Sequence, residues 1–164
     1  MNWTELKQKI YFKDGSFRDI YILQTNIEDN EKWADYVNES YRIEWFNGVT
    51  QADETKIDFA VIKEFWIGNQ DLCSTANVFI GKVQINNHFF IDTEIENDID
   101  PREINTISDH ECVVKYMTDL SNLLDKPVIL TPENEQETIL MIVSKSEVEY
   151  SKDIDPNKWK LKLR

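Results

Sequence analysis

The densest group of side chains that could do chemistry lies between residues 92 and 103. Six acids stand at positions 1, 3, 5, 7, 9 and 12 of this twelve-residue stretch, and with one arginine they give a local charge of −5. Oxygen ligands at this spacing are typical of a calcium-binding loop. A negative field of this kind would also attract a basic protein. The six candidate partner-binding residues are Asp92, Glu94, Glu96, Asp98, Asp100 and Glu103.

The calcium-loop interpretation conflicts with three features of the same stretch. Position 6, where such a loop needs glycine, is Asn97, and positions 3 and 5 are glutamates, which are longer than the usual aspartates. The preceding residues alternate as a strand does, whereas a calcium loop follows a helix. We therefore expect no bound metal and no cofactor. We interpret the segment as an acidic loop after a strand, held to the core by Ile95, Ile99 and Ile104, whose carboxylates either face only water or form a binding surface.

Other residues offer weaker candidates for catalysis or binding. His110 and Cys112 stand two apart on an expected helix and point to different sides, which prevents a Cys–His couple. Cys73 and His88 could meet only through tertiary contact, and we expect both cysteines to be buried thiols. No phosphate-binding glycine loop or G-x-S-x-G pattern occurs, so the sequence predicts binding without catalysis. The weaker set of binding candidates is Glu28, Asp29, Glu31 and Asp35.

The overall composition indicates a folded and strongly acidic protein. Hydrophobic residues make up 41% of the 164 residues and include five tryptophans, which argues against a disordered acidic chain. The net charge of −13 disfavours nucleic acid and anionic membranes as partners, and either solubility alone or a basic protein partner explains it. The sequence begins without the basic and apolar segments of a signal peptide and contains no membrane-spanning run, so we expect a cytoplasmic protein.

The fold is marked most clearly over Ile107–Val143. A capping box at Ser108–Glu111 predicts the start of a helix that ends near Asp125. Two short apolar runs follow, Val128–Leu130 and Ile139–Val143, and they predict a hairpin at the centre of a sheet with the helix lying across it. The apolar stripe of the helix consists of Cys112, Val113, Tyr116, Met117, Leu120, Leu123 and Leu124.

The remaining elements follow from turns, caps and alternation. The pair Asp14-Gly15 is typical of a type I′ turn and predicts a hairpin over residues 9–23. Residues 58–66 favour a helix capped by Asp58 and stopped by Gly68, although the same aromatics would suit a strand. The other expected elements are a helix over 25–40 opened by a capping box at Thr25–Glu28, a strand over 41–46, a polar loop over 49–55, and a β unit over 77–91 turned at Gly81-Lys82 or Asn86-Asn87.

Together these elements predict a single α+β domain over residues 1–150. We expect a mostly antiparallel sheet of about seven strands with two or three helices packed on it. Residues 151–164 differ in kind, because they carry a charge of +3 against −16 for residues 1–150. This basic C-terminal tail is expected to be either a flexible arm or an added edge strand.

Three segments resemble a family of small, mostly uncharacterised bacterial proteins. They are Tyr11–Tyr21, Glu94–Glu103 and Lys126–Asn134, and the resemblance extends over most of residues 9–143. In type, the chain is also similar to the acidic immunity proteins that accompany secreted toxins. The resemblance implies a small acidic α+β protein of this type, and it assigns no activity and no site residue.

Three functions remain open from the sequence. The first is an acidic binding protein, such as an immunity-type inhibitor whose acidic face occludes the basic active-site cleft of a toxin nuclease. The second is a small-molecule enzyme or ligand-binding domain with an aromatic-lined pocket, and the third is a structural or oligomerisation module. A deep pocket with convergent polar groups would favour the enzyme, whereas a flat or ridged acidic face would favour the binder. A large exposed apolar patch would favour the module.

Overall fold

A computed structural model describes residues 1–69, 75–151 and 154–164. Nine strands form one sheet in the order β3-β2-β4-β5-β6-β1-β7-β8-β9, and all of its pairings are antiparallel. The predicted α+β class is confirmed, with nine strands in place of about seven and four helices in the described residues. The strands are β1 (Arg18–Leu23), β2 (Arg42–Asn47), β3 (Ala52–Glu54), β4 (Ala76–Ile80), β5 (Val83–His88), β6 (Glu94–Ile99), β7 (Val128–Pro132), β8 (Met141–Ser144) and β9 (Glu147–Tyr150). The helices are α1 (Trp3–Lys9), α2 (Ile27–Ser40), α3 (Phe59–Trp66) and α4 (Ile107–Leu124).

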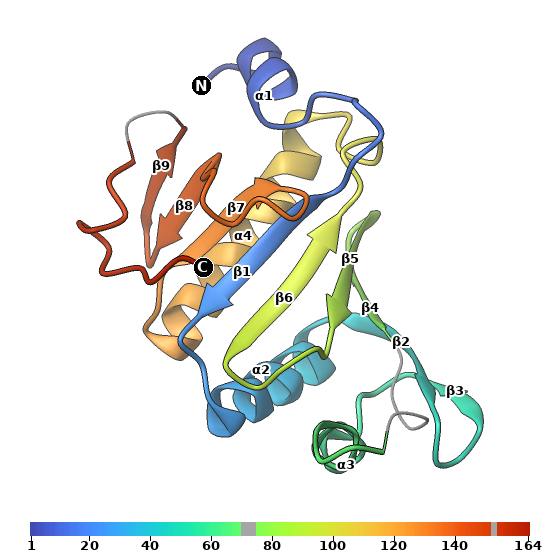
Figure 1. The fold of residues 1–164 in the computed structure, drawn as a ribbon. Helices are drawn as coiled ribbons and strands as arrows, with labels where there is room; N and C mark the ends of the chain where they lie inside the picture. The colour runs from blue at the N-terminus through green and yellow to red at the C-terminus, as the bar shows by residue number, and fades with distance from the viewer. Residues whose placement is uncertain (70–74, 152–153) are drawn as a thin grey trace.

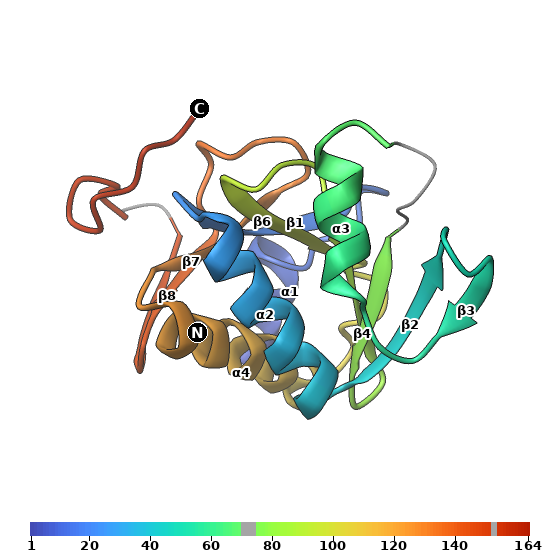
Figure 2. The same cartoon turned by 90° about the horizontal axis from the view of Figure 1, so that it is seen from below.

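The two faces of the sheet are covered differently. Helices α2 and α4 lie across one face, and the C-terminal segment 154–164 crosses part of the other (Figures 1 and 2). Strand β1 is buried at all six positions, with Ile20 and Ile22 in the core beneath the helices. Tyr21 and Leu23 point to the opposite side, where they form a second apolar cluster. We call this opposite side, which also carries Asp19, the polar face.

The capping box predicted at Ser108–Glu111 is wrong. Thr106 is the N-cap of α4: its hydroxyl accepts from the amide of Asp109 at 3.2 Å, and the Asp109 carboxylate accepts from the Thr106 amide at 2.8 Å. Asp109 also accepts from the amide of Asn105 at 2.9 Å. The capping box at Thr106–Asp109 therefore satisfies one more backbone donor than the predicted box at Ser108–Glu111 would. The predicted end of the helix is confirmed at Asp125, whose φ of 53° is left-handed.

The apolar stripe of α4 packs on β7 and β8. The predicted pairing of these two strands is confirmed, but they stand seventh and eighth in the sheet, and β6 holds the central position. The predicted stripe residues that are buried are Val113, Tyr116, Met117, Leu120 and Leu124, while Cys112 and Leu123 are half-buried. Cys112 is a free thiol, and Cys73 lies outside the described residues.

The hairpin predicted over residues 9–23 is wrong. Residues through Lys9 belong to α1, and strand structure begins only at Arg18. Gly15 has the positive φ that its turn signal required, 93°, but the turn is closed by Asp14, whose carboxylate accepts from the amide and hydroxyl of Ser16 at 3.1 and 2.7 Å. Residues 10–17 are therefore a loop without a partner strand.

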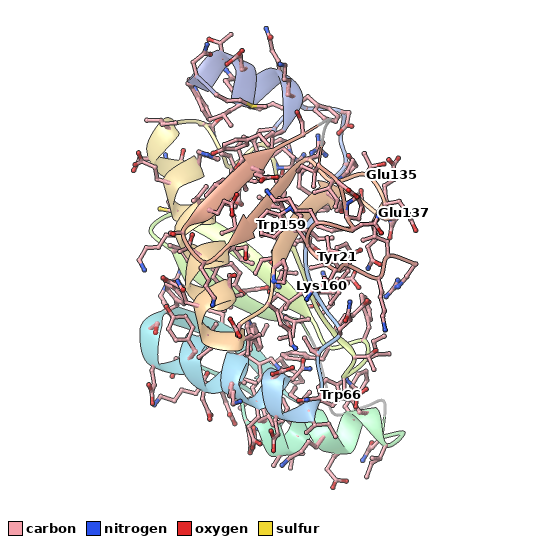
Figure 3. All side chains as sticks on the ribbon, turned by 90° about the vertical axis from the view of Figure 1, so that its left-hand side faces the viewer. Tyr21, Trp66, Glu135, Glu137, Trp159 and Lys160 are labelled. Carbon is pink, nitrogen blue, oxygen red and sulfur yellow. The ribbon has the colours of Figure 1, made fainter. Side chains whose placement is uncertain are left out.

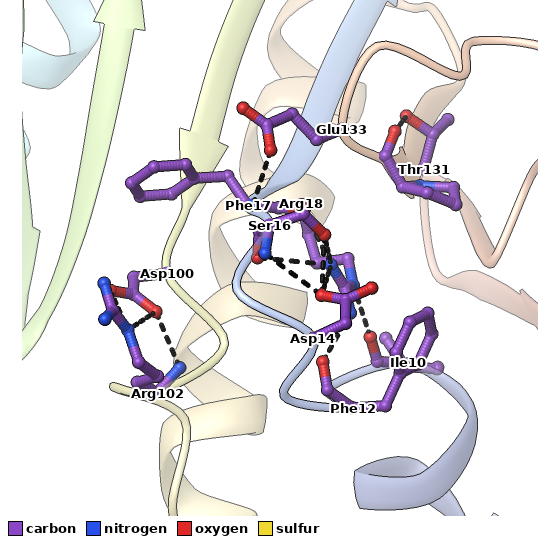
Figure 4. Close-up of polar contacts among 11 residues, drawn as sticks. Ile10, Phe12, Asp14, Ser16, Phe17, Arg18, Asp100, Arg102, Thr131 and Glu133 are labelled. Atoms are coloured by element: carbon purple, nitrogen blue, oxygen red, sulfur yellow. Dashed lines mark hydrogen bonds and ion pairs between the residues drawn. The ribbon is translucent and has the colours of Figure 1, made fainter.

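The Arg18 side chain explains how that loop satisfies its backbone. Its guanidinium is fully buried and donates to the carbonyls of Ile10 at 2.8 Å, Phe12 at 2.5 Å and Phe17 at 2.7 Å (Figure 4). It also lies 4.0 Å above the ring of Phe12. One arginine thus replaces the strand that a hairpin would have supplied, and only the folded chain brings these carbonyls together.

The segment predicted as an acidic loop is instead the central strand β6, which corrects the sequence interpretation. Ile95, Ile99 and Ile104 are buried, as expected. Glu94, Glu96 and Asp98 alternate to the other face, as the pleat of a strand requires, whereas Asn97 lies on the helix side, where its Oδ1 accepts from the hydroxyl of Tyr116 at 3.0 Å. Central placement of such residues is uncommon, since Asp and Asn are depleted in strands.

Most other local predictions are confirmed, with shifts at their ends. Helix α2 is capped by Asn26, one residue later than expected, and α3 is capped by Asp58 as predicted. The β4–β5 turn lies at Gly81, with φ of 60°, so the alternative turn at Asn86-Asn87 is wrong. The chain after β5 does not continue as a strand through residues 89–91. Part of the polar loop expected over 49–55 is the short strand β3.

The tail forms turns over the polar face, and no strand forms over Trp159–Leu163. Strand β9 occupies the edge of the sheet beside β8. None of the helices in the described parts of the chain is long and apolar enough to cross a bilayer.

A buried histidine joins three distant segments on the helix side. His110 of α4 pairs through Nδ1 with the hydroxyl of Tyr11 at 2.8 Å and through Nε2 with the hydroxyl of Tyr150 at 3.0 Å. A neutral imidazole can donate at one nitrogen and accept at the other, so both contacts are satisfied. Burial, together with the charge of the N-terminal ammonium, lowers the pKa of His110 to about 4.

The role of Arg18 predicts a large loss of stability when its donors are removed. Arg18→Met should lower the free energy of unfolding by about 3 kcal/mol or more, because several loop carbonyls lose their partner. Arg42→Met is the control, since that exposed guanidinium lies over Phe79 at 3.6 Å and should contribute less than about 1 kcal/mol. Urea unfolding measures both, and equal losses would contradict the role assigned to Arg18.

The pKa of His110 predicts a loss of stability on mild acidification. Between about pH 4 and 6.5 the unfolded chain binds a proton at His110 that the folded protein does not. Stability should therefore fall as pH drops through this window, by up to about 3 kcal/mol. Unfolding of wild type and His110→Gln between pH 7 and 4 measures this, and the variant should have the shallower slope. Parallel slopes would exclude His110 as the cause.

Candidate functional site

The candidate site is built by strand register on the polar face. Tyr21 stands opposite Glu96 and Asp19 opposite Asp98 in the β1–β6 pairing. In the β5–β6 pairing His88 stands opposite Glu96. Residues directly opposite one another in paired strands point to the same face, so these side chains gather although they come from three separate parts of the chain. We call Asp19, Glu96 and Asp98, with Tyr21 and His88, the carboxylate cluster.

One half of the cluster is centred on Tyr21. Its hydroxyl lies 3.0 Å from Asp19 Oδ2 and 3.2 Å from Glu96 Oε1, and its single proton can be donated to only one of them at a time. Asp19 Oδ2 also accepts from the amide of Asn134 at 2.7 Å. Burial raises the pKa of Asp19, and burial followed by the charge of Asp19 raises that of Glu96. The two carboxyls are therefore held where ionising both is unfavourable.

The other half is centred on His88 and Asp98. His88 Nε2 pairs with Asp98 Oδ2, and the hydrogen bond to Asp98 raises the pKa of His88. The second ring nitrogen lies 3.2 Å from the hydroxyl of Thr75, and Asp98 Oδ1 accepts from the Asn86 amide group at 2.7 Å. The imidazole also stacks on the ring of Phe90, with centroids 5.2 Å apart. The cluster thus carries one cation against three carboxyls when His88 is protonated.

The structure separates the six acids that the sequence grouped. Glu94, Glu96 and Asp98 alternate along β6 and share the polar face. Asp100 follows the strand and binds Arg102, whose Nε lies 2.9 and 2.8 Å from its two oxygens (Figure 4). The remaining two acids, Asp92 and Glu103, lie outside the cluster.

Asp92 and Glu103 are engaged outside the cluster. The carbonyl of Asp92 accepts from Thr25 and Asn30 at 2.8 Å each, which joins the start of β6 to α2. The carboxylate of Glu103 accepts from the amide of Gln84 at 3.2 Å. These two acids therefore hold loops in place, whereas the alternate residues of β6 remain on the shared face.

The weaker candidates Glu28, Asp29, Glu31 and Asp35 all lie on α2, on the other side of the sheet. Asp29 is buried 3.6 Å from the ammonium of Lys126, and Glu31 lies 3.8 Å from that of Lys63. The structure therefore does not bring this set together with the acids of β6.

Sequence reasoning missed Asp19, Tyr21 and His88 as members of one site. The alternation of β1 was visible, but its pairing with a strand more than seventy residues away was not. The excluded Cys–His couple involved His110, both of whose ring nitrogens face tyrosine hydroxyls. No group of three His, Cys, Asp or Glu residues in the described ranges is arranged to hold a metal ion.

Chemically, the cluster can share protons among carboxyls and pair with cations brought to the sheet. Four surface hollows of 260 to 640 Å³ are lined by other residues. Two of them border the cluster at His88: the one of 380 Å³ includes Thr75, whose hydroxyl lies 3.2 Å from His88 Nδ1, and the one of 260 Å³ includes Phe90, whose ring stacks on His88.

No model of a protein family, no curated protein and no solved structure matches this chain. The resemblance to immunity-type proteins therefore stays a hypothesis. Function is therefore inferred from the geometry of the polar face.

The raised pKa values predict that the cluster destabilises the folded protein at neutral pH. The folded state keeps protons on Asp19 and Glu96 above the pH at which an unfolded chain loses them, so stability falls as pH rises through their folded pKa values. Glu96→Gln should therefore increase the free energy of unfolding at pH 7, by roughly 1 kcal/mol, and change it little near pH 4.

Glu31→Gln on α2 is the matched control for this change, because its ion pair with Lys63 is exposed and should be worth less than about 1 kcal/mol. Urea unfolding at both pH values is the measurement. A Glu96→Gln protein that is less stable than wild type at pH 7 would show that the hydrogen bond from Tyr21 outweighs the charge repulsion.

Proposed function

We propose that the protein binds a basic protein partner through the carboxylate cluster, and that it acts as an immunity-type inhibitor by covering a cationic cleft such as that of a nuclease. The observation that carries the proposal is the convergence of Asp19, Glu96 and Asp98 from two adjacent strands on the polar face, opposite α2 and α4. Their carboxylates would lie where the phosphates of a nucleic acid sit in the partner.

The position of the acids on central strands supports binding for a physical reason. Strands β1 and β6 are paired on both edges, so the carboxyls are fixed before a partner arrives and little side-chain entropy is lost on binding. Asp19 and Glu96 have also lost part of their hydration, as the raised pKa values indicate. A lysine or arginine of the partner would remove the repulsion between them and favour the charged forms.

The surroundings of the cluster favour a binder over a small-molecule enzyme. An enzyme would place a deep hollow over its convergent polar groups, and none of the five cluster residues lines the four hollows given above for the described part of the chain. Beside the cluster, Phe90 stacks on His88 with 60% of its surface exposed, and Ile91 is exposed at the same hollow. Exposed apolar side chains that lie together mark interaction sites, and aromatic residues are enriched in protein interfaces.

Removing the cluster charges should abolish inhibition of a basic target. The test incubates the protein with a panel of purified basic nucleases and measures both nucleic-acid cleavage and the Kd of the complex. For a nuclease that wild type inhibits, Asp19→Asn/Glu96→Gln/Asp98→Asn should bind at least about tenfold more weakly, equivalent to about 1.4 kcal/mol. Binding of wild type should also weaken as salt is raised.

The control is Glu31→Gln/Asp35→Asn/Glu39→Gln, which removes three charges from exposed positions of α2. It should retain wild-type inhibition within about twofold at equal ionic strength. Equal losses in the two triple variants would mean that net charge alone drives binding. Failure of wild type to inhibit any member of the panel would remove the nuclease as the target class.

A further inference from the structure

A basic segment of the chain itself already occupies one end of the polar face. Trp159 of the C-terminal segment 154–164 lies over the sheet beside Tyr21 (Figure 3). The apolar floor beneath the segment consists of Tyr21, Leu23, Ile129 and Ile142, and the side chains that cover it are Ile154, Trp159, Leu161 and Leu163.

The charges of this segment match those beneath it. Lys158 pairs with Glu149 and lies 3.3 Å from Glu147, and its ammonium stands 4.4 Å from the centre of the Trp159 ring. At the chain end the Arg164 guanidinium pairs with Glu94 of β6. Within the protein, this surface therefore binds a segment that has a large aromatic side chain and a cation on either side of the surface it covers.

The segment is held mainly by side chains. Its backbone hydrogen bonds run largely within itself, for example from Lys158 to Asp155 at 3.0 Å and from Leu161 to Pro156 at 3.0 Å. In the described parts of the chain, the hydrogen bonds of its backbone with the remainder are those of the Ile154 amide with the carbonyl of Ser151 at 3.1 Å, and of the Lys160 carbonyl and the Arg164 amide with glutamine side chains, each at 3.2 Å. It adds no strand to the sheet, so it can leave without breaking a ladder.

The footprint of the segment runs into the carboxylate cluster. Glu94, which Arg164 covers, precedes Glu96 by one alternation of β6 and points to the same face. Tyr21 belongs to both places, because its ring lies under the tail while its hydroxyl contacts Asp19 and Glu96. A ligand longer than the tail could therefore continue from the apolar floor onto the cluster.

We propose that the partner of the polar face contacts it through a basic segment with a large aromatic anchor, and that this segment takes the place of residues 154–164. This rests on the proposed function, whose target it specifies. The tail then acts as an internal competitor, present at an effective concentration of the order of millimolar, and a partner must outcompete it.

The test uses a fluorescently labelled peptide with the sequence of residues 154–164 as the probe and the full-length protein as the receptor. Trp159→Ala weakens the protein's own tail without altering the sheet, so the peptide should bind this variant at least tenfold more tightly than wild type by fluorescence anisotropy. The affinity should fall with added salt, and it should fall at least threefold further when Glu94→Gln is combined with Trp159→Ala.

A second pair of variants guards against misfolding of Trp159→Ala. Lys158→Gln/Arg164→Gln alters only exposed ends of the tail and should also bind the peptide more tightly than wild type. Lys160→Gln/Lys162→Gln is the matched control, since these exposed lysines form no ion pair within the described residues, and it should behave as wild type.

Equal affinity of the peptide for wild type and for both tail variants would overturn the proposal. So would a peptide affinity that does not change when Glu94→Gln is added to Trp159→Ala. Dimerisation of the tail variants by sedimentation would also overturn it, because the occupant would then be a second copy of the chain. The outcome is separable from that of the proposed function. Peptide binding without nuclease inhibition would refute the nuclease target alone, whereas inhibition without peptide binding would refute the displaced tail alone.

Discussion

The burial of β1 on both faces is the constraint on which the rest of the structure depends. A sheet with helices on one side leaves the other side of its inner strands exposed, and β1 carries Tyr21 and Leu23 there. Burying one such aromatic or aliphatic side chain stabilises a fold by roughly 1.5 to 3 kcal/mol, so an open floor would be a substantial loss. The tail supplies the cover over β1, β7 and β8. Beyond the tail the same face becomes polar, and the carboxylate cluster begins there.

The ends of β1 and α4 are fixed by two buried polar side chains. Arg18 begins β1 and gathers the carbonyls of the preceding loop, which determines how the chain leaves α1. His110 near the start of α4 joins that same region, through Tyr11, to Tyr150 at the end of β9. The position of the tail, which follows β9, is thus tied to the N-terminal segment. Both side chains lose hydration, and both are satisfied, because Arg18 donates to fixed carbonyls and His110 contacts two tyrosine hydroxyls.

Local sequence signals predicted the elements whose ends are set by neighbouring residues. They failed where contacts between residues far apart in the sequence determine the structure. The cap at Asp58, the strand at 42–47 and the end of α4 follow from neighbouring residues, and they were predictable. The loop before Arg18 was read as a hairpin because its turn signal is genuine, whereas the guanidinium that replaces the second strand acts only in the folded chain. Strand β6 was read as a loop because acids and asparagine have low strand propensity, which pairing on both edges overrides. The cluster could not be predicted, because it depends on the register between strands that are far apart in the sequence, and no single segment determines that register.

Glu96 on β6 does not serve the stability of the sheet, and this bears on its role. An apolar residue in its place would suit a central strand better, and the raised pKa of Glu96 records the cost of keeping a carboxyl there. At the end of the face that the tail covers, the acid is compensated: Arg164 pairs with Glu94, and leucines of the tail cover the apolar floor. The protein therefore compensates one end of the face internally and leaves unfavourable charge at the other. A partner's cation would complete at Asp19 and Glu96 what Arg164 does at Glu94, and relief of the repulsion held in the free protein would add to the selectivity of binding for a cationic surface.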